Sequence, residues 1–385
     1  MAKQTTQQHF TELTSVLYLA FELSSKSWKL GFTIGFGQKP RIRTIAAGDL
    51  TLLRKEIAAA KKRFRLPEEC VVASCYEAGR DGFWLHRFLT AEGIQNLVVD
   101  SSSIEVNRRK RRAKADRLDA SSLVRMLIRY RCGEGRLWSV VHVPSEEEED
   151  RRQLHRELSA LEKESNRTRN RIRGLLVTQG VSLPSRRDLS EEELESIRIW
   201  DDTPLRAGLK GRIQRELARL RVLRDQKRSL TRLRRNALRG KDPDVEPDLE
   251  KIRQLQRLRA IGEVSAWLLV RELFGWRQFK NGRQVGSLSG LTPTPYQSGD
   301  THFEQGISKA GIVPVRQVAI ELAWCWLQYQ PNSKLTCWYN QRFANGGKKA
   351  RKVGIVALAR RLLIELWRYL ETGALPEGAE IKMAA

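Results

Sequence analysis

The fold of the first part of the chain is decided by residues 15–47, which read SVLYLAFELSSKSWKLGFTIGFGQKPRIRTIAA. Three runs rich in apolar, aromatic and β-branched residues follow one another here, Val16 to Ser24, Trp28 to Phe36 and Arg41 to Ala47. Each run is bounded by Ser, Gly, Pro or Asp, the residues that favour turns. The pattern predicts three successive strands with an antiparallel start.

Helices and strands alternate after these three strands. A basic helix is predicted from Leu52 to Phe64, a buried strand from Cys70 to Tyr76, a helix from Phe83 to Ala91, a strand from Gln95 to Asp100, and a helix from about Ala115 to Tyr130. The order β-β-β-α-β-α-β-α predicts an α/β domain whose sheet has an antiparallel side and a parallel side, covered by helices. This is an RNase H-like order of elements.

A long helical arm is predicted after Pro144. The acidic run Glu146 to Asp150 opens a charged helix, and apolar residues then recur at alternating fours and threes, apart from a gap at Ser165. The first series is Leu154, Leu158, Leu161, Thr168, Ile172 and Leu175, and a second series is Ile213, Leu217, Leu220, Leu223, Leu230 and Leu233. These heptads predict a helical hairpin or a coiled-coil dimerisation arm, and the alternative is an arm that packs only on its own core. The stretch from Ser185 to Lys210 is an insertion to which the sequence assigns no role.

The last part of the chain is predicted to be an all-α domain with a glycine-rich middle. It ends in an amphipathic helix from Val353 to Leu370, and its tryptophans stand at helical spacing among aliphatic residues, which predicts that they belong to the core. These are Trp267, Trp276, Trp324, Trp326 and Trp367. The chain is therefore predicted to divide into a flexible terminus (1–14), an RNase H-like domain (15–143), the arm with its insertion (144–250) and a helical C-terminal domain (251–385).

The charge of the chain points to a polyanionic partner. Lys and Arg number 70 against 45 Asp and Glu, which gives a formal net charge of +25 and a pI of about 10.3. Nucleic acid is the first candidate, and an anionic membrane surface is the competing one. The sequence has neither an apolar run long enough to span a bilayer nor a signal-peptide pattern, so we expect no membrane partner and a cytosolic, nucleoid-associated location.

Several classes of protein lack support in the sequence. The five cysteines form no C-x-x-C pair and the five histidines have no H-x-x-x-H partner, so they are interpreted as structural or surface residues, with the cysteines reduced. Walker A, dinucleotide-binding and H-E-x-x-H motifs are absent, which argues against nucleotide-driven enzymes and zinc proteases.

Four acids stand where an RNase H-like sheet would gather them. Glu22 lies in the first predicted strand, Glu77 ends the fourth, and Asp116 and Asp119 share one face of the helix after the fifth. Clustered carboxylates repel one another unless a divalent cation neutralises them, and hard oxygen ligands select Mg²⁺ or Mn²⁺. The set predicts a site for metal-dependent phosphoryl transfer, in which two ions can activate a nucleophile and stabilise a leaving oxygen.

A dense basic run precedes the last two acids. Six of the seven residues 108–114 are cationic: Arg108, Arg109, Lys110, Arg111, Arg112 and Lys114. A solvated charge run is one reading. Beside a metal cluster, such a run would instead draw a phosphate backbone into the site, with an effect that fades as salt rises.

Two segments of the C-terminal part are candidates for phosphate contact. Residues 258–266, LRAIGEVSA, are similar to a helix-hairpin-helix turn, with Gly262 at the start of a helix whose amides could bind phosphate. Downstream, two glycine-punctuated loops carry Ser298 and the pair Ser308-Lys309. A serine nucleophile needs an activating neighbour, and His302 is the only histidine near either loop. The residues alone do not choose between Ser298 and Ser308.

The ordered motifs resemble one known family. An acid in the first strand, CYEAG, KADRLDA, LRAIGEVSA, LSGLTPTPYQSGD and GISKAG are similar, from about Leu17 to Leu370, to the DEDD-type insertion-sequence transposases related to the Piv DNA invertases. The resemblance implies a RuvC-like domain and a C-terminal transposase domain joined by a coiled coil. It also implies that the four acids hold metal and that Ser298, in the Y-x-S-G loop, attacks DNA to form a 5′-phosphoserine link, while Ser308 and Lys309 contact backbone or phosphate.

The same resemblance implies partners and leaves alternatives. It implies double-stranded donor and target DNA, a structured bridge RNA that pairs with both, and a homo-oligomer, a dimer that assembles to a tetramer. One departure concerns the first acid, which is ordinarily Asp in the family and is Glu22 here, one methylene longer. The other readings are a RuvC-like junction-resolving nuclease that uses metal-activated water, and a catalytically weakened nucleic-acid-binding relative.

Overall fold

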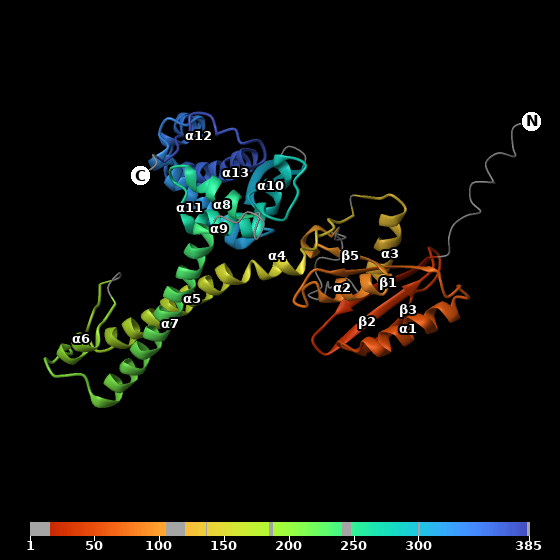
Figure 1. Ribbon diagram of the computed structural model, residues 1–385, viewed down its shortest axis with the longest axis horizontal. Helices are drawn as coiled ribbons and strands as arrows, with labels where there is room; N and C mark the ends of the chain where they lie inside the picture. Colours follow the sequence, from red (N-terminus) through yellow and green to blue (C-terminus); the bar gives the residue numbers. More distant parts are fainter. Residues whose placement is uncertain are drawn as a thin grey trace, which may run out of the picture. The chain divides into compact units, whose positions relative to one another are not determined.

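The structure is a computed structural model that describes residues 16–104, 120–135, 137–184, 188–240, 248–298 and 301–382; for residues 102, 295–298 and 301–305 it describes the backbone alone. Its contacts divide the chain into two compact units, Met1–Val143 and Pro144–Ala385 (Figure 1). Each unit is described by itself. The predicted flexible terminus, residues 1–14, lies outside the described residues, and the finer division into four parts stays a prediction.

The first unit begins with the predicted antiparallel strands. Strand β1 (Val16–Leu23) pairs with β2 (Ser27–Thr33), and β2 pairs with β3 (Arg41–Ala46), both antiparallel. The connection between β1 and β2 is a tight turn in which the Ser24 hydroxyl donates to the carbonyl oxygen of Ser27 at 2.6 Å. The predicted antiparallel start is confirmed.

Two parallel strands complete the sheet. Strand β4 (Val71–Glu77) pairs parallel with β1, and β5 (Gln95–Val99) pairs parallel with β4, which gives the order β3-β2-β1-β4-β5. Because crossovers must return the chain between parallel strands, helices lie between them, and the prediction of a mixed α/β sheet is confirmed.

Helices cover both faces of this sheet. Helices α1 (Leu50–Arg63) and α2 (Trp84–Ala91) contribute to one core with the odd-numbered β1 residues, whereas α3 (Ala120–Arg131) packs on Ala20 and Cys75 from the other side. A 3-10 turn, η2 (Ser101–Ser103), follows β5. At Gly31, an added Cβ would lie 2.7 Å from the Ala120 carbonyl oxygen, so this glycine allows the start of α3 to lie directly on the sheet.

The arm belongs to the second unit and is a pair of long helices. Helix α5 (Gln153–Val177) packs along α7 (Ala207–Arg239), and Figure 1 shows the two side by side. The predicted helical hairpin is therefore present, and Ser165 fills the gap in its heptads as a buried residue. The prediction that the acidic run opens the long helix was wrong. The run forms a separate short helix, α4 (Glu146–Asp150), because a turn at Arg151 and Arg152 interrupts the helix before α5 begins.

The insertion at the end of the arm packs on the two long helices. Helix α6 (Glu191–Ser196) begins with a capping box at Ser190, and apolar side chains from the insertion join Ile172 and Leu217 in one core. An ion pair between Arg169 Nε and Asp188 Oδ1 at 2.7 Å adds to this packing. The insertion closes the end of the hairpin.

The rest of the second unit is a helical domain. It contains α8 (Asp248–Arg257), α9 (Glu263–Leu269), the π-helical turn η4 (Val270–Phe274), α10 (Gly282–Leu288), α11 (Val313–Tyr329), α12 (Lys334–Tyr339), the π-helical turn η5 (Asn340–Ala344) and α13 (Lys348–Thr372). Among the described residues, no helix is long and apolar enough to cross a membrane.

Two predictions for this domain were incomplete or wrong. The glycine-rich middle is not wholly helix and loop, because β6 (Pro293–Ser298) and β7 (Thr301–Ile307) form an antiparallel hairpin. Trp267, Trp276 and Trp326 are buried as predicted, but Trp324 is 50% exposed and does not belong to the core. Helical spacing places Trp324 on the outer face of α11, since the inner face is taken by residues such as Trp326.

Candidate active-site edge and serine hairpin

Glu22 and Glu77 lie side by side at one edge of the sheet. Strands β1 and β4 are parallel with Phe21 opposite Tyr76, so the next residue of each strand is an acid at the carboxyl edge. Both acids line one pocket of about 350 Å³, whose lining also includes residues 78–82. The structure thus brings together the two described members of the predicted carboxylate set.

The two acids also share a face of the sheet. Side chains alternate along a strand, and Ala20 and Cys75, each two residues before an acid, belong to the core under α3. Glu22 and Glu77 therefore lie on the α3 face. The described part of α3 begins at Ala120 against Gly31, which pairs with Ala20 in the neighbouring strand.

Lys29 adds a cation to this edge. It stands opposite Glu22 in the β1–β2 register, and its Nζ lies 3.2 Å from Glu22 Oε2. The Glu22 side chain is only 22% exposed, whereas Lys29 is half exposed. Lys29 therefore offsets part of the negative charge that two adjacent carboxylates create, a role that the sequence did not reveal.

The other two predicted metal ligands cannot be placed. Asp116 and Asp119 lie outside the described residues, as does the whole basic run, Arg108, Arg109, Lys110, Arg111, Arg112 and Lys114. Within the described ranges, no group of three or more His, Cys, Asp or Glu residues could hold a metal ion. Of the four predicted metal ligands, Glu22 and Glu77 are the two that fall within the described ranges, and the metal site stays a prediction.

Two further acids lie near this edge and were missed in the sequence. Asp81 lines the same pocket and forms a 3.2 Å ion pair with Arg80. Asp100 directly follows β5, in a register that places Val99 opposite Glu77. The position of Asp100 could have been predicted from the sequence. An acid that directly follows a buried parallel strand lies at the same edge of the sheet as an acid, such as Glu77, that ends the neighbouring strand.

Ser298 lies at the tip of the β6–β7 hairpin. It pairs with Thr301 across the turn, and His302 stands opposite Gln297, one step from the tip. The base of the hairpin is the pair Pro293 and Ile307. At ~3.3 Å per residue, the five steps from Pro293 to Ser298 separate tip and base by about 16 Å.

Ser308 and Lys309 lie at the base of this hairpin. The Ser308 amide donates to the Thr292 carbonyl at 2.9 Å, and the Lys309 amide donates to the Gly290 carbonyl at 3.2 Å. Both residues are exposed. The structure therefore does not bring the two candidate serines together: one marks each end of the hairpin, and they cannot contact the same phosphate.

Close backbone approach fixes the loop that carries Lys309. An added Cβ would lie 1.9 Å from the Ala310 carbonyl oxygen at Gly290, and 2.1 Å from the Leu288 carbonyl oxygen at Gly311. Lys309 itself has a φ of 55°, a left-handed conformation that is costly for a side-chain-bearing residue. Residues other than glycine could not hold the two loops in this contact.

Arg316 completes the loop and was not predicted from the sequence. Its Nη1 donates to the Lys309 carbonyl at 2.9 Å and lies 3.4 Å from the Ala310 carbonyl oxygen. Arg316 comes from the first turns of α11, so it ties the loop to a helix of the domain core. The hydrogen bond holds Lys309 in its left-handed conformation with its side chain exposed.

At the predicted helix-hairpin-helix turn, a carboxylate of the protein itself lies at the helix N-terminus. Gly262 is the N-cap of α9, as expected, but Glu263 occupies the first turn and pairs with buried Arg234, with Oε1 and Nε 2.6 Å apart. A carboxylate at a helix N-terminus already interacts with its positive end. Phosphate binding at Gly262 therefore stays a prediction that this geometry does not support.

A buried ionic cluster joins the arm to the helical domain. Glu272 accepts hydrogen bonds from His155 Nε2 at 2.9 Å and from Arg156 Nε at 2.7 Å. Burial opposes ionisation of this carboxyl group, but the hydrogen bonds from His155 and Arg156 outweigh it and lower the pKa of Glu272 to about 2. Glu272 is thus an ionised structural group that fixes α5 to the π-helical turn η4.

The chain is similar to known transposases along most of its length. Residues 252–336, which include the β6–β7 hairpin, match the family model "Transposase IS116/IS110/IS902 family". A putative transposase, y4rJ, of Sinorhizobium fredii is 41% identical over 377 residues, covering 95% of this chain and 94% of that protein. The transposase for insertion sequence element IS1533 of Leptospira borgpetersenii is 23% identical, with coverage of 76% and 79%. The transposase for IS1328 of Yersinia enterocolitica is 26% identical, with coverage of 56% and 60%. The chain belongs to the IS116/IS110/IS902 family of transposases.

Proposed function

We propose that this protein is the recombinase of an insertion sequence, which cleaves DNA and exchanges its strands at a metal-dependent site. The observation that carries the proposal is the meeting of Glu22 and Glu77 in one pocket at the carboxyl edge of parallel strands. The relatives named as transposases of insertion-sequence elements support the reaction class. The mixed sheet with helices on both faces supports a RuvC-like reading of the first unit.

The proposed metal is Mg²⁺ or Mn²⁺, held by Glu22, Glu77, Asp116 and Asp119. Carboxylate oxygens are the ligands these hard cations prefer, and the two described acids lie on the sheet face from which α3 extends. When bound, the metal would polarise a phosphoryl oxygen and stabilise a leaving oxygen. Lys29, beside Glu22, limits the charge repulsion between the carboxylates and orients the first acid.

The proposed nucleophile is Ser298. Its hydroxyl oxygen attacks the scissile phosphorus, the bond from phosphorus to the 3′ oxygen breaks, and that oxygen leaves as a 3′-hydroxyl after gaining a proton. The DNA stays attached through a 5′-phosphoserine ester, and attack by another 3′-hydroxyl releases Ser298 and joins new strands. The position of Ser298 at the hairpin tip supports this role, because a tip can enter a DNA site that a loop at the hairpin base cannot reach.

The proposed partners are donor and target duplex DNA, a bridge RNA and other copies of the chain. A net charge of +25 suits either nucleic acid, and base pairing by an RNA would leave the protein to recognise shape and backbone. The proposed assembly is a dimer that forms a tetramer, so that cleavage waits for all DNA ends. Support for the RNA and for the assembly comes from the resemblance of the motifs alone.

A second candidate function is a RuvC-like junction-resolving nuclease. It is favoured by one observation, that Glu22 and Glu77 lie side by side in one pocket at the carboxyl edge of parallel strands, where metal-bound carboxylates could activate a water molecule. A metal-activated water would then attack the phosphorus, and no protein–DNA ester would form. The third reading is a catalytically weakened relative that only binds nucleic acid. It is based on Glu22, which stands where the family ordinarily has Asp and which already pairs with Lys29.

The test compares Ser298→Ala with the matched variant Ser308→Ala. With Mg²⁺, the bridge RNA and nicked donor and target duplexes that trap the covalent product, the wild-type protein and Ser308→Ala are expected to give a protein–DNA adduct on a denaturing gel. Ser298→Ala is expected to give none, because only the tip serine attacks. An adduct that persists in Ser298→Ala would contradict the assignment of Ser298 as the nucleophile. Metal-dependent cleavage by that variant, with free 5′-phosphate ends, would favour the junction-resolving nuclease.

A further inference from the structure

Helix α7 carries more Lys and Arg residues than any other helix or strand that the structure describes. Its 33 residues include twelve Lys or Arg and only two acids, Glu216 and Asp225. From residue 226 to its end at Arg239, the helix has six cations and no acid. The contact between α5 and α7 does not need this charge, because it rests on the buried side chains of Ile213, Leu217 and Leu220.

The cations near the tip of the arm are used within the fold. Arg221 pairs with Glu191, Lys210 with Glu195, and Arg224 Nη2 lies 3.2 Å from Asp188 Oδ2. These bonds hold the insertion on the hairpin. With the pair of Arg219 and Glu216, they account for four of the six cations before residue 226. In the second half, Lys227 pairs with Glu162 and Arg234 with Glu263, and the four remaining cations are unexplained by such pairs.

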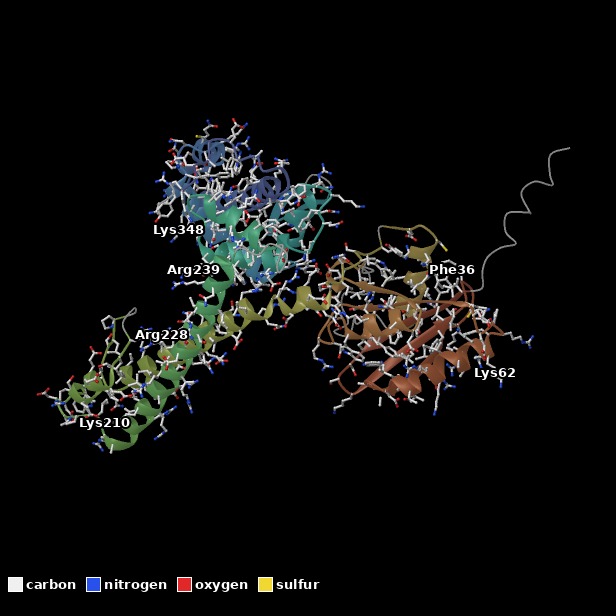
Figure 2. All side chains as sticks on the ribbon, viewed as in Figure 1. Phe36, Lys62, Lys210, Arg228, Arg239 and Lys348 are labelled. Carbon is white, nitrogen blue, oxygen red and sulfur yellow. The ribbon has the colours of Figure 1, made fainter. Side chains whose placement is uncertain are left out.

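The second half of α7 presents an arginine stripe, which we define as Arg228, Arg232, Arg235 and Arg239. Steps of four, three and four residues place these side chains on one face of the helix, and all four are exposed. Arg228 reaches Asp225 one turn back at 3.5 Å, and the other three have no ion pair in the part of the chain that the structure describes. Figure 2 shows Arg228 and Arg239 along this stretch of α7.

Ordinary helix stability does not explain the stripe. Like charges three or four residues apart destabilise a helix, and the stripe contains three such pairs. The helix dipole favours cations only in the last turn, which accounts for Arg239 and not for Arg228 or Arg232. A solvated face usually mixes both signs, as α5 does with Glu162, Lys163 and Glu164.

We propose that the arginine stripe binds the phosphate backbone of duplex DNA. Guanidinium groups match phosphate with paired donors, and the stripe spans about 16 Å, the axial length of about five base pairs. Helix α7 has no aromatic residue on which unpaired bases could stack, so a double helix fits better than a single strand. A second copy of the arm would bring the same positive stripe and be repelled.

The stripe is rigidly attached to the domain that carries the serine hairpin. Arg234, on the opposite side of the same turns, is buried and pairs with Glu263 of α9, and Arg253 Nε of α8 donates to the Leu238 carbonyl at 3.1 Å. The stripe and the hairpin belong to the same compact unit. DNA held on the stripe is therefore held by the same unit that carries Ser298, outside the site proposed for cleavage.

The test measures binding of the full chain, freed of nucleic acid at high salt, to duplex DNA of arbitrary sequence in EDTA. The stripe variant combines Arg228→Gln, Arg232→Gln, Arg235→Gln and Arg239→Gln. The matched control combines Lys39→Gln, Lys55→Gln, Lys62→Gln and Arg63→Gln, four exposed first-unit cations that have no ion pair within the described ranges. Each lost phosphate contact lowers the slope of log affinity against log salt by about 0.9, so the stripe variant, which loses four, is expected to lose about 3.6 in slope and the control less than 1.

Three outcomes overturn the proposal. One is an unchanged slope in the stripe variant, and another is an equal loss in both variants, which would mean net charge alone. The third is a loss confined to an RNA duplex of the same length, which would make the stripe an RNA surface. Circular dichroism and thermal unfolding confirm that both variants fold. Because binding is measured in EDTA, without the metal that the proposed cleavage needs, a failure here is distinct from a failure of the cleavage mechanism.

Discussion

The carboxylate edge of the first unit and the serine hairpin of the second are built in opposite ways. At the carboxylate edge, regular parallel strands present charged side chains, Glu22 and Glu77, at a common end. At the hairpin base, backbone packing determines the structure. Gly290 and Gly311 allow two backbone segments to lie in close contact, and this contact holds Lys309 in a left-handed conformation. Charge therefore specifies one region and steric space specifies the other. The two regions should respond differently to substitution, in activity at the first and in stability at the second.

The largest effect is expected for Glu77→Gln at the carboxylate edge. The change keeps the shape of the side chain and removes the charge that the proposed metal needs, so strand cleavage is expected to fall by at least about a thousandfold. The free energy of unfolding should change by no more than about 0.5 kcal/mol, because the residue lies at a strand end facing a pocket. Cleavage assays and chemical denaturation measure the two quantities.

Asp81→Asn is the control for Glu77→Gln. Asp81 lines the same pocket but pairs with Arg80 and is not a proposed ligand. It should retain most of the cleavage activity. Equal loss in both variants would mean that the whole pocket, rather than the predicted carboxylate set, carries the metal, and a large stability loss in Glu77→Gln would break the contrast between the regions.

A carboxylate of the second unit should behave in the reverse manner. Glu272, whose pKa of about 2 is well below the ordinary value of 4.5, accepts hydrogen bonds from His155 and Arg156. A depressed folded-state pKa contributes stability above the unfolded pKa, and that contribution is lost as pH falls from about 4.5 toward 2. The shift corresponds to about 3 kcal/mol at neutral pH.

The variant Glu272→Gln tests this assignment. It should lower the stability of the second unit by about 3 kcal/mol at pH 7 and make its unfolding less dependent on pH between about 4.5 and 2. Equilibrium unfolding at several pH values measures both effects. Unchanged stability, or a pH dependence identical to that of the wild type, would show that the cluster does not hold the arm on the domain.

The sequence predicted the strands of the first region and the meeting of Glu22 and Glu77, because side-chain chemistry specifies these features. Alternation and turn residues located the strands, and the acids ending β1 and β4 meet because the ends of parallel strands share an edge. Lys29 was missed because its pairing with Glu22 depends on the register of an antiparallel pair, which residue types alone do not fix.

The second region was less predictable because backbone geometry specifies it. Pro293 and Pro295 made the β6–β7 hairpin read as a loop, since proline removes a donor from a strand ladder. The left-handed Lys309 and its bond from Arg316 depend on contacts between segments distant in the sequence. The glycines were visible as a cluster, but the residues they approach were not.

The smallest expected difference in stability is the one between two glycine substitutions in the hairpin region, and it separates backbone strain from close approach. Gly290 and Gly306 both have positive φ, 68° and 93°, so alanine should cost about 1–2 kcal/mol at either position. At Gly290 the new Cβ would also meet the Ala310 carbonyl oxygen at 1.9 Å, whereas at Gly306 no atom that the structure describes lies within 4 Å. Since a backbone atom must then move, Gly290→Ala should exceed Gly306→Ala by about 1–3 kcal/mol in urea denaturation. Equal costs would mean that the loop at Lys309 adjusts freely, and that the contact between the two loops does not set the position of Lys309.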